Sequence, residues 1–232
     1  MAAGVEWSHV AYPQKAYFGP GMLARVGEVA RELGISRAML VTTSGRLASE
    51  AGQQLASRLG SRLASVFSGV RSHVPTSAVQ SALSQARAEG VDAVVSFGGG
   101  SCMDAAKAVC FLAEQQEGTP GTSFLDRPAV KHLAIPTTYS GAEATPFFGM
   151  TDETTRRKSG AGGPTTLPVA VVYDPALTLK TPGRTSAETG MNALAHGVEA
   201  SYSPSRSPEA EELALAAVRR VALALPQVVE RP

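Results

Sequence analysis

The sequence has few of the features that direct a chain to an oxidising compartment or into a membrane. It contains two cysteines, Cys102 and Cys110, which stand about 12 Å apart if their segment is one helix, beyond disulfide reach. No run of about 18 apolar residues occurs, and the N-terminus has no basic stretch followed by an apolar core. The sequence therefore predicts reduced thiols, a cytoplasmic location and no membrane partner.

An excess of charge of one sign is also missing. The chain of 232 residues has 21 Lys and Arg against 20 Asp and Glu, so its formal net charge is +1. Such a chain has no broad positive field to attract nucleic acid or an anionic membrane. We therefore expect local recognition of a small molecule and no nucleic-acid partner.

Short apolar runs alternate regularly with longer segments that are rich in Ala, Leu and Arg at helical period. This alternation is typical of βα units and a parallel sheet, and it predicts a doubly wound α/β unit over the first 135 residues. Strands are predicted at residues 37–42, 62–67, 92–97, 131–135 and 169–173. Helices are predicted at residues 21–33, 47–59, 76–89 and 101–114.

The amino-acid composition changes after Pro136. Residues 137–168 are rich in Gly, Pro and Thr, which favours a β-hairpin and binding loops. Beyond the last strand, a Pro/Gly linker leads to two predicted helices at 186–202 and 208–225. Two helices are too few to cover their own apolar faces. We therefore expect a truncated chain whose exposed helix face favours self-association, with a homodimer as one form.

Residues 92–109, DAVVSFGGGSCMDAAKAV, form the strongest local signal: a strand, three glycines and a helix that opens at Ser101. Glycines let the backbone approach a phosphate closely, and a helix N-terminus attracts anions. The pattern is neither GxGxxG nor a Walker A motif. The alternative is a tight turn without a ligand, with Asp104 and Lys107 as a solvated pair on the helix surface.

The segment GGGSCMDAAKA resembles the GGGSxxDxAK element of the iron-containing alcohol dehydrogenases and their relatives, glycerol dehydrogenase and dehydroquinate synthase. Three more segments, at 135–152, 171–182 and 189–202, resemble that family in its order and spacing. The resemblance implies a dehydroquinate synthase-like architecture. An α/β doubly wound parallel-sheet NAD(P)-binding domain would span residues 1–182, and residues 183–232 would be the first helices of an incomplete α-helical catalytic domain.

The resemblance also implies residues that bind NADH or NADPH. The glycine loop would hold the pyrophosphate, the carboxylate would lie near the nicotinamide, two threonines would follow its ribose and phosphates, and a lysine would contact cofactor oxygens. These implied residues are Gly98, Gly99, Gly100, Ser101, Asp104, Thr137, Thr138 and Lys158. Taken alone, the threonine pair also fits a turn motif, and the lysine fits a hairpin turn kept soluble by charge.

Family members often carry an acidic residue after the second strand, where it binds the adenosine ribose hydroxyls. Here Thr42, Thr43 and Ser44 stand in its place. A carboxylate would repel the 2′-phosphate of NADPH, whereas these hydroxyls and nearby Arg46 tolerate it. The resemblance therefore adds Thr43 to the cofactor-binding residues and leaves both cofactors open.

Metal-dependent members of the family present Asp and His four residues apart on one helix, a spacing that directs both side chains at a divalent ion. This chain has Asn192 and His196 there, and no histidine follows. Because asparagine offers a neutral oxygen, no metal is expected. For His196 alone, a structural role on a packed helix face is the alternative.

The segments GMNALAH and PTTYSGAEATPFFGMT resemble the maleylacetate reductase branch of the family. The resemblance implies reduction of a dicarboxylate, 2-maleylacetate to 3-oxoadipate, in aromatic-compound degradation. Asn192 and His196 would be the catalytic residues that stabilise the enolate, without a metal. Two alternatives stay open: a metal-dependent alcohol or polyol dehydrogenase, and an inactive nucleotide-binding fragment.

Overall fold

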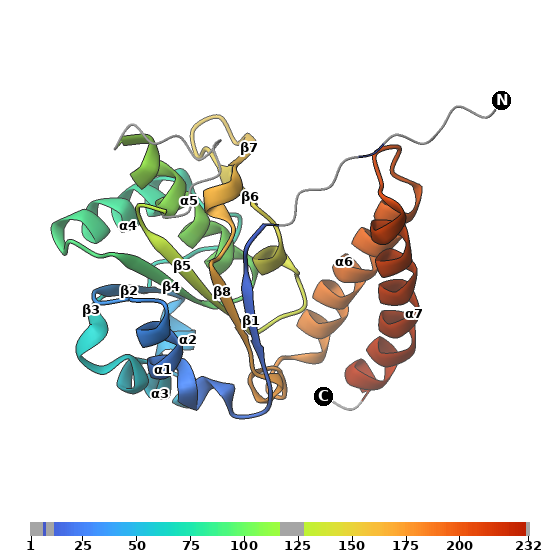
Figure 1. The fold of residues 1–232 in the computed structure, drawn as a ribbon, viewed down its shortest axis with the longest axis horizontal. Coiled ribbons are helices and arrows are strands. Elements are labelled where there is room, and N and C mark those ends of the chain that lie inside the picture. Colours follow the sequence, from blue (N-terminus) through green and yellow to red (C-terminus); the bar gives the residue numbers. More distant parts are fainter. Residues whose placement is uncertain (1–6, 8–11, 117–127, 231–232) are drawn as a thin grey trace. The chain divides into compact units, whose positions relative to one another are not determined.

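The computed structural model describes residues 7, 12–116 and 128–230, and the chain divides into two compact units (Figure 1). The α/β unit contains residues 13–137 and 141–178. The helical unit contains residues 138–140 and 179–230, and the described residues Trp7 and Tyr12 group with it. The division into a cofactor domain and a catalytic domain at 182/183 stays a prediction about the roles of the two parts.

A six-stranded parallel sheet forms the centre of the α/β unit, in the order β1-β8-β5-β4-β2-β3. Its strands are β1 (Lys15–Phe18), β2 (Ala38–Val41), β3 (Leu63–Phe67), β4 (Ala93–Gly98), β5 (Lys131–Pro136) and β8 (Ala170–Tyr173). The predicted doubly wound parallel sheet is confirmed. Strand β1 was missed because it is a short, largely exposed edge strand that pairs only with β8, so no apolar run marks it.

Helices cover both faces of this sheet (Figure 1). One face carries α1 (Val26–Glu32), α2 (Ser44–Ala48) and α3 (Glu50–Leu59), and the other carries α4 (Thr76–Ala88) and α5 (Gly100–Gln116). Successive residues of β2 alternate between the two cores: Leu40 packs on the α1 and α3 side, and Met39 and Val41 pack on the α4 and α5 side. Burial on both faces explains why the central strands read as continuous apolar runs.

Two predicted helices are each divided in the structure. The first consists of a 3₁₀ turn, Met22–Arg25, followed by α1. The second was predicted to start at Leu47, but α2 already begins at Ser44 and ends before Ser49, which has an extended backbone. The Ser49 hydroxyl accepts a hydrogen bond from Gly52 N (3.1 Å) and so caps α3. This cap starts a new helix where periodicity alone suggested one continuous helix.

The predicted hairpin is confirmed as β6 (Phe147–Thr151) paired antiparallel with β7 (Lys158–Gly162). Short 3₁₀ turns, η3 (Ala142–Ala144) and η4 (Pro164–Thr166), precede and follow it. The hairpin packs along α5. It therefore belongs to the face of the sheet that α4 and α5 cover.

The Asp174-Pro175 pair after β8 has a structural role in the α/β unit. One carboxylate oxygen of Asp174 accepts hydrogen bonds from Gly21 N (3.0 Å) and Ala176 N (3.1 Å), and the other accepts one from Leu23 N (2.9 Å). Asp174 is buried, so these three backbone donors satisfy it. It joins the end of β8 to the turn that begins the first helix.

The helical unit consists mainly of α6 (Gly183–Tyr202) and α7 (Pro208–Glu230), packed closely on each other. A Cβ atom at Gly190 would lie 2.4 Å from a Leu225 methyl carbon, and one at Gly197 would lie 2.9 Å from Val218. These glycines allow the close approach of the two helices. The predicted end of the second helix at residue 225 was wrong: α7 continues through Pro226 to Glu230, and a Cβ atom at Gly183 would lie 3.4 Å from Val229 O in its last turn.

Several large apolar side chains of α6 and α7 are exposed: Met191, Val198, Tyr202, Leu213, Leu215 and Leu223. Among the described residues, no helix combines the length and the apolar character needed to cross a membrane.

Candidate functional site

The glycine loop joins β4 to α5, and its first residue has a backbone that other amino acids rarely adopt. Gly98 has φ 148°, and a Cβ atom there would lie 2.5 Å from the Cys102 sulfur. Its carbonyl accepts a hydrogen bond from Thr137 N (2.9 Å) at the end of β5. The first turn of α5 leaves backbone N–H groups without partners inside the helix. The loop therefore presents bare backbone and donors suited to an anionic group.

The sheet topology places this loop at a switch point. Strands β2 and β4 are neighbours, yet the chain leaves β2 towards α2 and α3 on one face and leaves β4 towards α5 on the other. In open α/β sheets, ligands bind in the crevice outside the carboxyl ends of such a strand pair. The glycine loop, which follows β4, and the segment around Thr43, which follows β2, flank that crevice.

The hydroxyls after β2 are already engaged in local structure. Thr42 is buried and donates to Phe97 O (2.7 Å), so its hydroxyl ties β2 to β4. The Thr43 hydroxyl accepts from Arg46 N (3.2 Å) and caps α2. Burial raises the pKa of Cys102 to about 12, and the Arg46 charge opposes that rise. Arg46 therefore lies within electrostatic range of the first turn of α5.

Asp104 and Lys107 are not a solvated surface pair. Lys107 is fully buried, and the Asp104 carboxylate accepts a hydrogen bond from Gly149 N of β6 (3.2 Å). Burial raises the pKa of Asp104, while the Gly149 N–H, Lys107 and Lys158 partly offset the rise. Both side chains thus face the hairpin. The available signal was the apolar character of α5 around Lys107, which is typical of a buried helix.

Lys158, the first residue of β7, pairs with Thr151 of β6, and its side chain extends over Gly149, two residues earlier on that strand. A Cβ atom at Gly149 would lie 2.5 Å from Lys158 Cε, so a side chain there would require the lysine stem to shift. The charge of Lys158 acts on Asp104. The structure therefore brings the predicted residues Asp104 and Lys158 into electrostatic range of each other, and Arg156 and Arg157 remain exposed in the hairpin turn.

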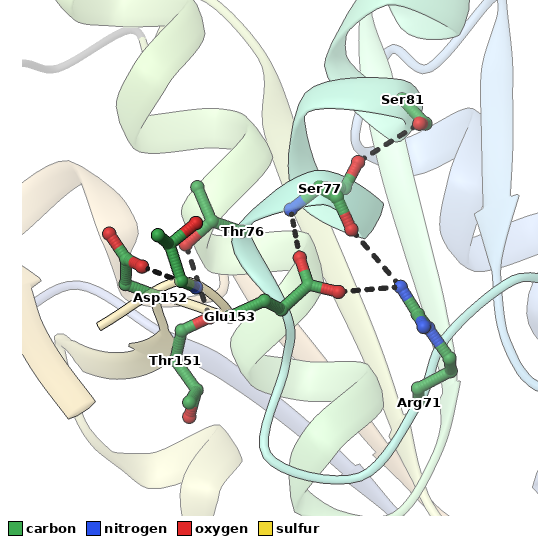
Figure 2. A network of polar contacts seen from close by, with 8 residues as sticks. Arg71, Thr76, Ser77, Ser81, Thr151, Asp152 and Glu153 are labelled. Carbon is green, nitrogen blue, oxygen red and sulfur yellow. Dashed lines mark hydrogen bonds and ion pairs between the residues drawn. The ribbon is translucent and has the colours of Figure 1, made fainter. Parts of the chain in front are cut away.

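The turn of the hairpin is attached to the N-terminus of α4, as Figure 2 shows. The Glu153 carboxylate accepts hydrogen bonds from Ser77 N (3.1 Å) and from the Arg71 guanidinium (3.3 Å), which also donates to the Ser77 hydroxyl (3.1 Å). The N-cap position of α4 is Pro75, which has no side-chain cap, so Glu153 takes that role from a distant segment. Sequence reasoning missed this contact because it has no local signal.

Replacing Glu153 with glutamine is expected to lower the melting temperature at pH 7 and to lower it less at pH 3. Hydrogen bonds from Ser77 and the charge of Arg71 lower the pKa of Glu153. The stability it contributes is therefore present above the pKa of the unfolded chain and is lost as pH falls through the folded pKa. Circular dichroism melts at both pH values test this, with exposed Glu212→Gln as the control. Equal melting temperatures of wild type and E153Q at pH 7 would contradict it.

The loop after β5 divides between the two units. Thr137 closes the α/β part, and Thr138–Ser140 belong to the helical unit. Within the helical unit, Tyr139 N donates to the Thr189 hydroxyl (3.3 Å). The Thr138 hydroxyl oxygen is buried and has no hydrogen-bond partner among the described residues.

Asn192 and His196 lie one turn apart on α6 and are in contact. The Asn192 amide nitrogen is 3.1 Å from His196 Nε2 and also donates to Ser140 O (3.2 Å). His196 Nδ1 lies 3.5 Å from a Glu199 carboxylate oxygen. With both amide hydrogens in use, neutral His196 accepts at Nε2 and carries its proton at Nδ1, facing Glu199. The i,i+4 pairing was predicted, whereas the Ser140 and Glu199 partners were not.

Within the described residues, this pair offers a metal ion few donors. Asn192 and His196 supply two neutral donors, and within residues 12–116 and 128–230 no group of three or more His, Cys, Asp or Glu side chains is arranged to hold a metal ion. The α/β unit, by contrast, fits a dinucleotide, because it combines a bare glycine loop and a helix N-terminus at a switch point with a nearby lysine.

Known proteins share this combination of sequence and fold. The family model for iron-containing alcohol dehydrogenase matches residues 13–175. A maleylacetate reductase of Rhizobium sp. (strain MTP-10005) is 37% identical over 220 residues, which cover 95% of this chain and 57% of that protein. The crystal structure of a maleylacetate reductase from Agrobacterium tumefaciens is similar with a TM-score of 0.83 at 36% identity, covering 96% of this chain and 58% of that one.

A sulfoacetaldehyde reductase from Bifidobacterium kashiwanohense, solved in complex with NAD+, gives a TM-score of 0.89 at 25% identity. The comparison covers 99% of this chain and 62% of that one. The chain therefore spans less than two-thirds of the length of these relatives. Since the family match extends over more than half of the sequence, the chain belongs to the iron-containing alcohol dehydrogenase family.

Proposed function

We propose that this chain provides the cofactor-binding part, over residues 1–182, and the start of the catalytic part, over residues 183–232, of an NAD(P)H-dependent reductase. Its reaction would be that of a maleylacetate reductase, 2-maleylacetate to 3-oxoadipate. The glycine loop at the switch point supports the cofactor, and similarity to maleylacetate reductases over nearly the whole chain supports the substrate. A homodimer remains a prediction.

The proposed cofactor, when bound, supplies a hydride. The backbone of the glycine loop would hold its pyrophosphate, with Asp104 and the Thr137–Thr138 pair along the nicotinamide half and Lys158 on its phosphate oxygens. No carboxylate stands at the end of β2, and Arg46 lies near the first turn of α5. A 2′-phosphate would therefore meet no repulsion, and both NADH and NADPH are expected to bind.

The proposed substrate carries an alkene conjugated to a ketone, so hydride can add at the alkene carbon remote from the ketone. The electron pair of the alkene then moves onto the ketone oxygen as an enolate, and a proton completes the reduction at the neighbouring carbon. Such a substrate needs hydrogen-bond donors and an acid, and it does not require a Lewis acid. We propose that the reaction runs without a metal.

His196 is proposed to be that acid. In the neutral pair, Asn192 donates to Nε2, and protonation of Nε2 would break this bond and leave an N–H donor there. The second ring N–H would remain directed at Glu199. Asn192 would hold the neutral ring in place before this protonation, and the imidazolium would stabilise the enolate and deliver the proton.

A titration with NADH and with NADPH, followed by measurement of maleylacetate-dependent loss of NADH absorbance after EDTA treatment, tests the proposal. We expect both cofactors to bind and turnover to survive EDTA. Absence of binding would contradict the cofactor site. Binding without turnover would favour an inactive nucleotide-binding fragment, and alcohol oxidation restored by Zn²⁺ or Fe²⁺ would favour a metal-dependent dehydrogenase.

The variants Asn192→Ala and His196→Ala are expected to lower turnover at least about tenfold while the Kd of NADH stays unchanged, because neither side chain is placed on the cofactor. Val198→Ala, on another face of α6, is the matched control and should change neither value. A shift of the Kd with no loss of turnover would contradict these roles.

A further inference from the structure

Lys107 is a buried cation whose hydrogen bonds to the described residues all go to one segment of the chain. Its ammonium group donates to Ala142 O, to the Thr145 hydroxyl (3.2 Å) and to Phe147 O (2.8 Å). An ammonium group has three hydrogens, so all of its donors serve residues 142–147. Lysine is almost never fully buried unless it is paired in this way.

The surroundings of Lys107 offset only part of the cost of burying its charge. Burial lowers the pKa of Lys107 to about 8, and the nearby carboxylates of Asp104 and Glu143 oppose that change. An apolar side chain at this position would avoid the burial of a charge. Such a side chain could not donate the three hydrogen bonds that Lys107 donates.

The segment held by Lys107 leads directly into β6. Two residues beyond Phe147, Gly149 N donates to Asp104, which lies one helical turn before Lys107 on α5. Gly149 also lies against the stem of Lys158. Helix α5, which begins at the glycine loop, therefore holds β6 through Asp104 and Lys107. The side chain of Lys158 lies against this same strand.

We propose that Lys107 is a positioning residue for the cofactor site: by fixing residues 142–147 on α5, it holds the β6–β7 hairpin and Lys158 in a set position relative to the glycine loop. The inference rests on the proposed cofactor site. Lys107 itself touches no cofactor and acts through the hairpin.

The variant Lys107→Met keeps the apolar stem and removes the three donors. We expect faster amide hydrogen exchange over residues 142–151 in the cofactor-free protein and unchanged exchange over 93–98. We also expect a Kd for NADH about tenfold higher, with turnover at saturating NADH unchanged. Thr145→Val removes one of the three acceptors and should produce a smaller change in the same direction. Lys131→Met is the control, because Lys131 is a lysine of β5 whose ammonium contacts Gly34 O (3.2 Å), and it should change neither value.

Unchanged exchange over 142–151 in K107M would overturn the proposal, and so would faster exchange with an unchanged Kd. If K107M does not fold, T145V decides by the same two measurements, and no change in either overturns the proposal. If the wild-type chain binds neither NADH nor NADPH, the proposed function and the positioning role fail together. Exchange in the cofactor-free K107M protein would then show whether Lys107 holds the segment, separately from that failure.

Discussion

Alanine in place of Gly98 is expected to raise the Kd for NADH and NADPH about 100-fold or more and to lower the free energy of unfolding by about 3 kcal/mol. Two separate causes act at this residue. Its φ of 148° is unfavourable for any side chain, and the added Cβ would lie 2.5 Å from the Cys102 sulfur. Relief of either strain would move the loop that is proposed to hold the pyrophosphate.

The two causes can be separated by a second substitution. In the double variant Gly98→Ala/Cys102→Ala, the contact with the sulfur is gone, while the backbone strain and a 3.2 Å contact with the Cβ atom of residue 102 remain. We therefore expect urea unfolding to show partial recovery of stability, and fluorescence titration to show that cofactor binding stays weak. Equal stability of the single and double variants would show that the sulfur contact is unimportant.

Gly90→Ala is the matched control. Gly90 also has a positive φ, 56°, but a Cβ atom there would have no heavy atom within 4 Å among its non-adjacent neighbours, and it stands before β4, at the other end of the strand. It should lose about 1 kcal/mol of stability from backbone strain alone and keep its cofactor affinity. If G98A were destabilised but bound NADH like G90A, the glycine loop would not be the cofactor site.

Acid is expected to destabilise the chain through His132 on β5. His132 is buried, with Nε2 2.7 Å from the Ser96 hydroxyl oxygen. Burial, assisted by the charge of Lys107, lowers the pKa of His132 to about 3. Below a pH of about 6.5 the unfolded chain binds a proton at His132 that the folded chain does not bind. The free energy of unfolding therefore decreases as the pH is lowered. The contribution reaches about 2 kcal/mol at pH 5 relative to pH 8.

His132→Gln removes this titration and retains a group able to contact Ser96. We expect urea unfolding at pH 8 and pH 5 to show a difference smaller by about 2 kcal/mol in H132Q than in wild type. His73→Asn serves as control, since His73 is exposed and asparagine tolerates its positive φ of 61°. An equal pH difference in wild type and H132Q would show that other groups account for the acid sensitivity.

Periodicity and glycine spacing predicted those elements of the α/β unit that a local sequence pattern marks. The central strands were found because both of their faces are buried, whereas β1 at the edge has no such pattern. The break at Ser49 was missed because a capping hydroxyl overrides helical period at a single residue. The predicted helix boundaries were therefore wrong where a single side chain, and not the apolar face of a helix, decides where the helix starts.

The residues of the candidate site also fall into two groups, those that a local motif marks and those that it does not. The glycine loop and the Asn192–His196 pair are local motifs, so their spacing predicted them. The partners of Lys107 and Glu153 lie more than 30 residues away in the chain, and no spacing rule connects them. The role of Lys107 follows only from the packing of the hairpin on α5, and that of Glu153 only from the contact of the hairpin turn with the N-terminus of α4 (Figure 2).

The assignment of Thr138–Ser140 to the helical unit has a consequence for dissecting this chain. Between β5 and η3 the polypeptide leaves the α/β unit for three residues, and Thr189 and Asn192 of α6 accept and donate the hydrogen bonds of that excursion. A clone that ends at Thr178 would keep every strand but leave Tyr139 N and Ser140 O without these partners. The two units are interleaved along the sequence, so a stand-alone nucleotide-binding module would require redesign of this excursion and not only a stop codon.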